Sequence, residues 1–137
     1  MSTRLKVAVE RQREYETVYI LRPGVSPEDV TKTRERVEGV IENTGGHMLR
    51  FDDWGLRRLA YEVRDRTDAS YHERGHYQYY RFLAPATTVA EIERNLRILD
   101  PVLKFLTVKL QEDLIPEERL ARGVEEEVHD VLMGEEE

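Results

Sequence analysis

The sequence predicts an α+β domain of the split βαβ type: a four-stranded antiparallel sheet with two helices on one of its faces. The prediction rests on the order of the apolar patterns, which runs strand, helix, strand, strand, helix, strand. The length of 137 residues suits one domain with a core of its own. Because both crossovers are expected to be right-handed, the helices share one face and the other face of the sheet is left open.

Turn and capping signals mark the first strand and the first helix. Residues 14–22 alternate and are rich in β-branched and aromatic side chains, and a Pro-Gly pair at 23–24 ends the strand. Ser26 is a good N-cap, Pro27 suits the first helical position, and the acids that follow favour the positive end of the helix dipole. Apolar residues then continue at helical spacing until the Gly-Gly pair at 45–46.

The middle of the chain is predicted to form two strands joined by a polar loop. Residues 47–63 are interpreted as one long strand with a bulge near 52–55, residues 64–74 as the loop, and residues 75–84 as the next strand. Alternation along that next strand separates its side chains into two faces, with Tyr80, Phe82 and Ala84 on one and Tyr77, Tyr79 and Arg81 on the other.

The second helix and the last strand follow. Thr88 and Glu91 have the spacing of a capping box, so the helix is expected to begin at Thr88 and to end at Asp100. Residues 102–110 form the last predicted strand. Beyond this strand the apolar content falls, and only residues 117–120 are expected to form a short helical turn.

Charge is distributed unevenly along the chain. There are 21 basic and 28 acidic residues, which give a net charge of −7 at pH 7. Residues 111–137 hold 11 of the acids and two of the bases, so they carry −9 and leave +2 for the rest. We expect an N-terminal extension over residues 1–13, a domain over residues 14–110, and an acidic, mobile tail over residues 111–137 that adds little to the core.

Composition also bounds the class of protein. The chain has no Cys, which excludes a disulfide scaffold, a thiolate zinc site and a cysteine nucleophile. No apolar run approaches the roughly 20 residues of a membrane-spanning helix. Charged residues interrupt the N-terminus before a signal-peptide core could form. The expectation is a soluble cytoplasmic protein without a membrane partner.

No catalytic or metal-binding constellation stands out. His72 and His76 have a helical metal-ligand spacing, but they fall at a loop–strand junction, where that spacing loses its meaning. Asp52 and Asp53 are interpreted as part of a bulge rather than as an acid–base pair. The loop at 22–27 has one glycine and two prolines, which leaves few amides for the phosphate cradle of an acyl-phosphate-cleaving enzyme. We therefore expect no enzyme activity, no cofactor and no metal.

Arginine is the residue type that favours RNA binding. The chain has 17 Arg and four Lys, and arginine both forks onto phosphates and stacks on bases, although a genomic bias toward Arg codons would give the same composition. Residues 74–81 begin like the third-strand signature of RNA-recognition domains. They then have His76, Gln78 and Arg81 where that signature needs stacking aromatics, so this stacking platform is not expected.

The strongest local signal is the string Gly-Leu-Arg-Arg-Leu-Ala-Tyr at residues 55–61. Arg57 and Arg58 on a rigid strand can bridge phosphates, and a tyrosine can stack or donate a hydrogen bond. Alternation predicts Leu59 and Tyr61 on one face and Arg58 on the other. An arginine pair in a strand also serves simply to protect a sheet edge, so the string taken alone leaves both interpretations open.

Four segments together resemble the small-subunit ribosomal protein S-six family of bacteria. They occur in the family's order and spacing across residues 13–110, and the 55–61 string is the most specific of them. The connection over residues 64–74 is longer than is usual in the family. The other three segments are Arg-Glu-Tyr-Glu at 13–16, Tyr-Gln-Tyr-Tyr-Arg-Phe at 77–82 with Ala-Pro at 84–85, and Ile-Glu-Arg-Asn-Leu-Arg-Ile-Leu-Asp at 92–100 leading to Val-Lys at 108–109.

The resemblance implies a ferredoxin-like domain that is a structural constituent of the small ribosomal subunit and not an enzyme. It implies binding to the central domain of 16S rRNA together with ribosomal protein S-eighteen, among other small-subunit components of the cytoplasmic ribosome. The alternative is a protein–protein docking domain that uses its open sheet face without direct RNA binding. Carried over by position, the implied RNA or partner contacts are Arg13, Tyr15, Arg57, Arg58, Tyr61, Arg94 and Arg97.

Overall fold

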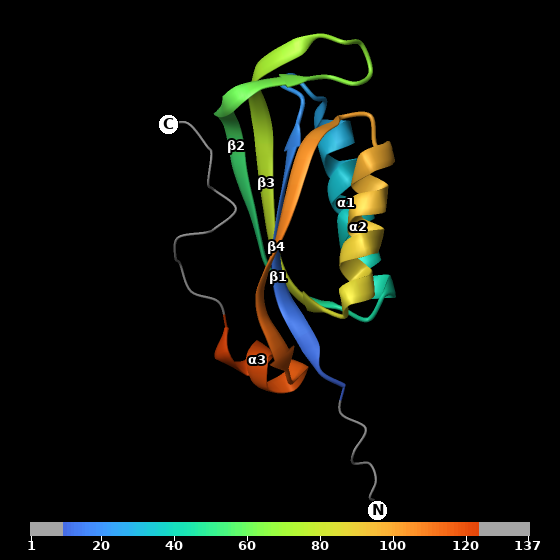
Figure 1. Ribbon diagram of the computed structural model, residues 1–137, viewed down its shortest axis with the longest axis vertical. Coiled ribbons are helices and arrows are strands. Elements are labelled where there is room, and N and C mark those ends of the chain that lie inside the picture. Colours follow the sequence, from blue (N-terminus) through green and yellow to red (C-terminus); the bar gives the residue numbers. More distant parts are fainter. Residues whose placement is uncertain (1–9, 124–137) are drawn as a thin grey trace, which may run out of the picture.

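A computed structural model describes residues 10–123 of the chain (Figure 1). Four strands and two helices follow one another in the expected order, and a third helix comes at the end of the described residues. Their bounds are β1 Gln12–Leu21, α1 Pro27–Asn43, β2 His47–Arg64, β3 Tyr71–Ala84, α2 Ala86–Ile98, β4 Val102–Leu114 and α3 Pro116–Arg122.

The strands form one antiparallel sheet in the order β2-β3-β1-β4. Helices α1 and α2 lie side by side on one face of this sheet (Figure 1), so the predicted ferredoxin-like split βαβ fold is confirmed. The predicted division of β3 into two faces is confirmed as well. Tyr80 and Phe82 belong to the core beneath the helices, whereas Tyr77 and Tyr79 belong to a separate cluster on the opposite face, which we call the open face.

Helix α1 begins as its sequence predicts. The Asp29 amide donates to the Ser26 hydroxyl over 3.1 Å, which satisfies one of the N–H groups that a helix start leaves without a partner. Val37 and Ile41 are buried against the sheet. The helix therefore forms because a capped, acidic first turn is followed by one apolar stripe that the sheet can bury.

The predicted start of α2 at a Thr88 capping box is wrong. The helix begins at Ala86, directly after Pro85, and Thr88 is buried within its first turn. The Thr88 amide donates to the Pro85 carbonyl over 3.0 Å, and its hydroxyl shares a 2.7 Å hydrogen bond with the hydroxyl of Thr44 at the end of α1. Thr88 thus joins the two helices instead of capping one of them.

The hairpin between β2 and β3 is longer than the sequence predicts. The single long β2 strand is confirmed, and its pairing with β3 shifts register at three places. The expected loop over residues 64–74, however, is shortened to residues 65–70, because β2 continues to Arg64 and β3 begins at Tyr71. The turn is tightened by an Ala69 amide that donates to the Asp65 carbonyl over 2.8 Å.

The two ends of the domain also lie outside their predicted positions. Strand β1 already includes Gln12 and Arg13. At the other end, β4 continues to Leu114 and α3 follows it, so the ordered body extends well beyond residue 110. The expected mobile tail therefore differs from the structure over residues 111–122, while its remainder, like residues 1–9, lies outside the described residues.

Candidate RNA- and partner-binding surface

The open face has an apolar half. Val18 and Ile20 from β1 lie beside Tyr77 and Tyr79 from β3, and all four are nearly fully buried. Trp54 of β2 stacks on Tyr79 with ring centroids 5.0 Å apart. This stacked indole gives the neighbouring side chains of strand β2 a rigid support.

The other half of the open face is a buried charge cluster. Glu14 and Glu16 of β1 are 4% and 1% exposed, and the Arg81 guanidinium lies 3.4 Å and 3.3 Å from their carboxylates. Arg119 of α3 approaches from outside, with Nε and Nη2 donating to the two oxygens of Glu14 over 2.6 Å and 3.0 Å. The cluster neutralises its own charge, so Arg81 is a structural residue.

Burial and hydrogen bonding raise the pKa of Tyr79 within this cluster. The phenol lies in the interior and donates to Glu16 over 2.8 Å. In the register of β1 and β3, Glu16 lies directly opposite Arg81. The contact with Arg119 joins residues 105 positions apart, and no local pattern predicts a pairing at that separation.

A glycine bulge positions the 55–61 string. Gly55 has φ +75°, a left-handed conformation that glycine adopts without a steric penalty. Its amide donates to the Asp53 carboxylate over 2.9 Å. Burial would raise the pKa of Asp53, but hydrogen bonds from Gln78, Gly55 and His76 outweigh it and lower the pKa. Asp53 is thus an ionised, structural carboxylate, as the sequence interpretation of this pair as part of a bulge expected.

The two arginines of the string occupy different environments. The Arg57 guanidinium lies over the Trp54 ring, 5.2 Å from its centroid, and is half-buried. Arg58 is exposed on the other side of the strand. The string therefore offers one guanidinium held by stacking and one that extends into solvent.

Leu59 and Tyr61, which were expected on one face, lie in different environments, and their shared face stays a prediction. Between the pairs Arg58↔Arg74 and Val63↔His72, four residues of β2 lie opposite a single residue of β3, so alternation is interrupted by a wide bulge. Leu59 is 5% exposed and packs into the apolar half of the open face, while Tyr61 is 75% exposed. Within this irregular stretch, the buried Leu59 holds the segment against the sheet, and Tyr61 lies on the surface.

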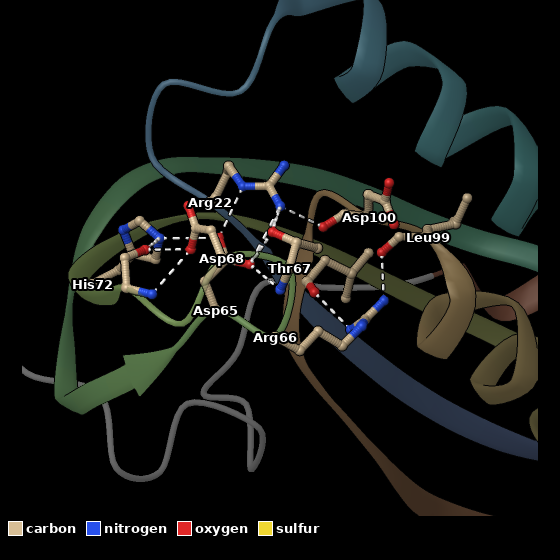
Figure 2. A network of polar contacts seen from close by, with 10 residues as sticks. Arg22, Asp65, Arg66, Thr67, Asp68, His72, Leu99 and Asp100 are labelled. Atoms are coloured by element: carbon tan, nitrogen blue, oxygen red, sulfur yellow. Dashed lines mark hydrogen bonds and ion pairs between the residues drawn. The ribbon is translucent and has the colours of Figure 1, made fainter.

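The tip of the β2–β3 hairpin is tied to the body by a polar network around Asp65 (Figure 2). Asp65 is 2% exposed. Arg22 Nε donates to its carboxylate over 3.0 Å, the Thr67 hydroxyl over 2.6 Å, and His72 lies 3.1 Å from it. The hydrogen bonds from Arg22 and Thr67 lower the pKa of Asp65 far below its usual range.

Two arginines extend this tie to the connection between α2 and β4 (Figure 2). Arg22 Nη2 donates to the Asp100 carbonyl over 2.7 Å. Arg66 donates to the carbonyls of Leu99 and Val102 over 2.8 Å and 3.1 Å. The hairpin is thus a fixed arm rather than a free loop. Sequence reasoning missed it, although the spacing of Asp65 and Thr67 is that of an Asx turn.

The remaining candidate residues do not join Arg57, Arg58 and Tyr61. Arg94 and Arg97 lie on α2, on the helical side of the sheet, and pair with Glu91 over 2.9 Å and Glu93 over 3.9 Å. Arg13 lies in β1 and pairs with Glu112 of β4 over 4.0 Å. All three arginines are at least partly exposed.

Tyr15 is not a surface residue. It is 6% exposed and its ring stacks on Phe82 with centroids 5.6 Å apart, inside the core beneath the helices. Odd-numbered side chains of β1 point to the helical face, which places this tyrosine among core residues. The implied contact role for Tyr15 is therefore corrected to a role in packing.

Metal and membrane features can be judged over the part of the chain that the structure describes. Within residues 10–123, no three His, Cys, Asp or Glu residues group together to hold a metal ion. His72 and His76 instead bond to Asp65 and Asp53, respectively. None of the helices in that range is both long and apolar enough to cross a membrane.

Comparison with known proteins agrees with the resemblance noted in the sequence. The model of the family described as "Ribosomal protein S6" matches residues 14–109. A small ribosomal subunit protein bS6 from Solidesulfovibrio magneticus is 43% identical over 105 residues, covering 77% of this chain and 97% of that protein. The protein of the same name from Trichlorobacter lovleyi is 40% identical over 109 residues, covering 80% and 83%.

A solved structure supports the fold. The crystal structure of 30S ribosomal protein S6 from Thermotoga maritima superposes with a TM-score of 0.63 at 24% identity, over 81% of this chain and 95% of that one. Members of the family are structural, non-catalytic components of the small subunit of the cytoplasmic ribosome. The family match over residues 14–109, which include most of the sheet and both covering helices, shows that this chain belongs to the ribosomal protein S6 family, as a structural component of the small ribosomal subunit.

Proposed function

We propose that this chain binds the central domain of 16S rRNA together with ribosomal protein S-eighteen, and that Arg57, Arg58 and Tyr61 make its main contacts. The bulge in β2 carries the proposal, because it keeps Tyr61 on the surface while Leu59 anchors the same segment in the core. A guanidinium suits a phosphate, and a tyrosine ring suits an unstacked base. Because the segment is pinned before binding, little conformational entropy is lost on contact.

The need for a partner follows from charge. Residues 1–110 carry a formal charge of only +2, and several arginines are neutralised inside the fold, such as Arg22 by Asp65 and Arg81 by Glu14 and Glu16. Counterion release scales with the number of phosphates that a protein neutralises. The chain alone is therefore expected to bind RNA modestly, and a basic partner would supply the phosphate contacts that it lacks.

Arg13, Arg94 and Arg97 are proposed as secondary contacts to RNA or to the partner. Each is paired with an acid at the surface, and such exposed pairs are worth at most about 1 kcal/mol. Exchanging an acid for an RNA phosphate would therefore cost little. Tyr15 is left out of the contact set because the core covers it.

A second candidate function is docking of a partner protein on the open face without RNA contact. An exposed apolar side chain on this face favours it, because Leu106 of β4 is 44% exposed and lies opposite Val18 of the apolar cluster. Under this alternative the partner complex would form normally, and substitutions at Arg58 would leave RNA affinity unchanged.

The test is a titration of a labelled 16S central-domain fragment with the chain premixed with ribosomal protein S-eighteen. Arg58→Ala is expected to weaken binding about tenfold and to reduce the salt slope by about 1. The matched control is Arg122→Ala, which removes an exposed arginine from α3. Equal affinities of the two variants would refute the assigned surface. Partner binding without any RNA binding would favour the docking alternative.

A further inference from the structure

A second arginine faces Arg58 across the hairpin. In the register of β2 and β3, Arg58 lies directly opposite Arg74, and both are exposed. Directly opposite residues of an antiparallel pair have Cβ atoms about 4.5–5.5 Å apart and project on the same side. Two guanidinium groups therefore start from neighbouring positions on one side of the hairpin.

No acid within residues 10–123 forms an ion pair with either arginine. Most other arginines of the described part have such a neighbour, such as Arg50 with Asp52 over 2.9 Å. The nearest acid along β3, Glu73, projects to the opposite side because consecutive strand residues alternate. Like charges directly opposite each other are destabilising. The two arginines therefore repel each other, and no acid of the described residues offsets this repulsion.

The hairpin holds this pair in place from two directions. At its base, Gly75 packs so closely on β1 that an added Cβ would overlap the Ile20 side chain and lie 3.2 Å from the Leu21 carbonyl. At its tip, the Asp65 network fastens the turn to the body (Figure 2). The separation of the two arginine backbones is therefore set by the fold before any ligand arrives.

We propose that Arg58 and Arg74 together bind one phosphate group of the RNA backbone. The proposal rests on the function proposed above and adds Arg74 as a second ligand of the same phosphate. An arginine presents its donors in a planar fork that suits phosphate oxygens. A phosphate seated between two forks would receive charge-assisted hydrogen bonds from both and would remove the repulsion between them.

The first test concerns the free, full-length chain and uses inorganic phosphate as the probe. Arg74→Gln is expected to raise the thermal midpoint by about 1–2 °C at low salt, because it relieves the repulsion. This gain should vanish near 1 M salt, where the Debye length falls to about 3 Å. Inorganic phosphate should protect the wild-type chain more than the Arg74→Gln variant. A lower midpoint for the variant at low salt would mean that an acid of the chain already neutralises the pair, and would overturn the proposal.

The second test measures affinity for the 16S fragment with the partner protein present. Arg74→Gln should lose about tenfold in affinity, and Arg58→Gln should add little on top, since both arginines serve one phosphate. The control is Arg64→Gln, an exposed arginine of the same hairpin that lies opposite Tyr71 rather than another arginine. An Arg74 variant that binds like this control would overturn the proposal.

The two proposals fail in distinguishable ways. If the wild-type chain and its partner do not bind the 16S fragment, the proposed function fails, whatever the phosphate probe shows. If they bind it but phosphate protects the wild-type and Arg74→Gln chains equally, the two arginines do not form a phosphate site and only the inference about the pair is overturned.

Discussion

Removal of the Arg119 guanidinium should destabilise the domain far more than the position of this residue near the C-terminus suggests. Arg119 is 7% exposed, donates to both oxygens of Glu14, and also donates to the Gly123 carbonyl over 2.7 Å. Breaking a buried ion pair by removing one partner typically costs about 3–5 kcal/mol. Arg81 remains 3.4 Å from Glu14 and offsets part of the loss, so we expect about 2–4 kcal/mol for Arg119→Ala.

The assay is urea unfolding of the full-length chain at neutral pH, with Arg122→Ala as the control on the same helix. The control should change the free energy of unfolding by less than about 0.5 kcal/mol, because Arg122 is exposed. An Arg119→Ala variant within that same margin, with an unchanged m value, would refute the claim that α3 is fastened to the sheet. Truncation after Leu110 should likewise destabilise the domain, contrary to the expectation from composition that residues 111–137 add little.

Three further predictions concern the hairpin. The pKa of Asp65 is lowered in the folded state, so its stabilisation is complete above the unfolded pKa of about 3.9 and is lost as pH falls further; Asp65→Asn should therefore cost about 1–3 kcal/mol at pH 7 and progressively less below pH 4, as measured by urea unfolding across pH. Gly75→Ala should cost at least about 2 kcal/mol by overpacking against Ile20, which a shift of the thermal midpoint would report and an unchanged midpoint would contradict. Tyr61→Ala should leave that midpoint nearly unchanged, because the side chain is 75% exposed, yet weaken binding to the 16S fragment; a strongly lowered midpoint would show instead that the ring packs against the fold.

Local chemistry allowed most of the fold to be predicted from the sequence. Ser26 begins α1 because its hydroxyl accepts a hydrogen bond from the amide three residues later. Any chain that enters a helix at a serine brings these two groups close together. The two faces of β3 follow from simple alternation, since Phe82 packs beneath the helices and Tyr79 on the open face. Signals of this kind act between neighbours and do not depend on the rest of the molecule.

Most of the features that sequence reasoning missed depend on distant residues. Thr88 has the local pattern of a cap, but its side chain instead shares a hydrogen bond with the hydroxyl of Thr44 at the end of the other helix. In the sequence, Arg119 is one of two bases in an acidic segment, and its role is visible only once the fold places Glu14 within hydrogen-bonding distance. Tyr61 is exposed and Leu59 is buried in a stretch where β3 supplies only one residue opposite four, and a register of that kind is a property of two strands together.

The candidate surface was predicted in part. The 55–61 string drew attention to Arg57, Arg58 and Tyr61, and the family resemblance implied their contact role, which stays a prediction. Arg74 was quoted within another segment but could not be joined to Arg58, since its register partner is known only once the length of the hairpin is known.

The most direct test of the central claim is the affinity of the full-length chain for a 16S central-domain fragment, measured with and without ribosomal protein S-eighteen across a range of salt concentrations. We expect weak, salt-sensitive binding by the chain alone, because residues 1–110 carry a formal charge of only +2. We expect binding at least about tenfold tighter when the partner is present. Tight, salt-insensitive binding by the chain alone, or no gain from the partner, would contradict the proposed joint binding of the RNA.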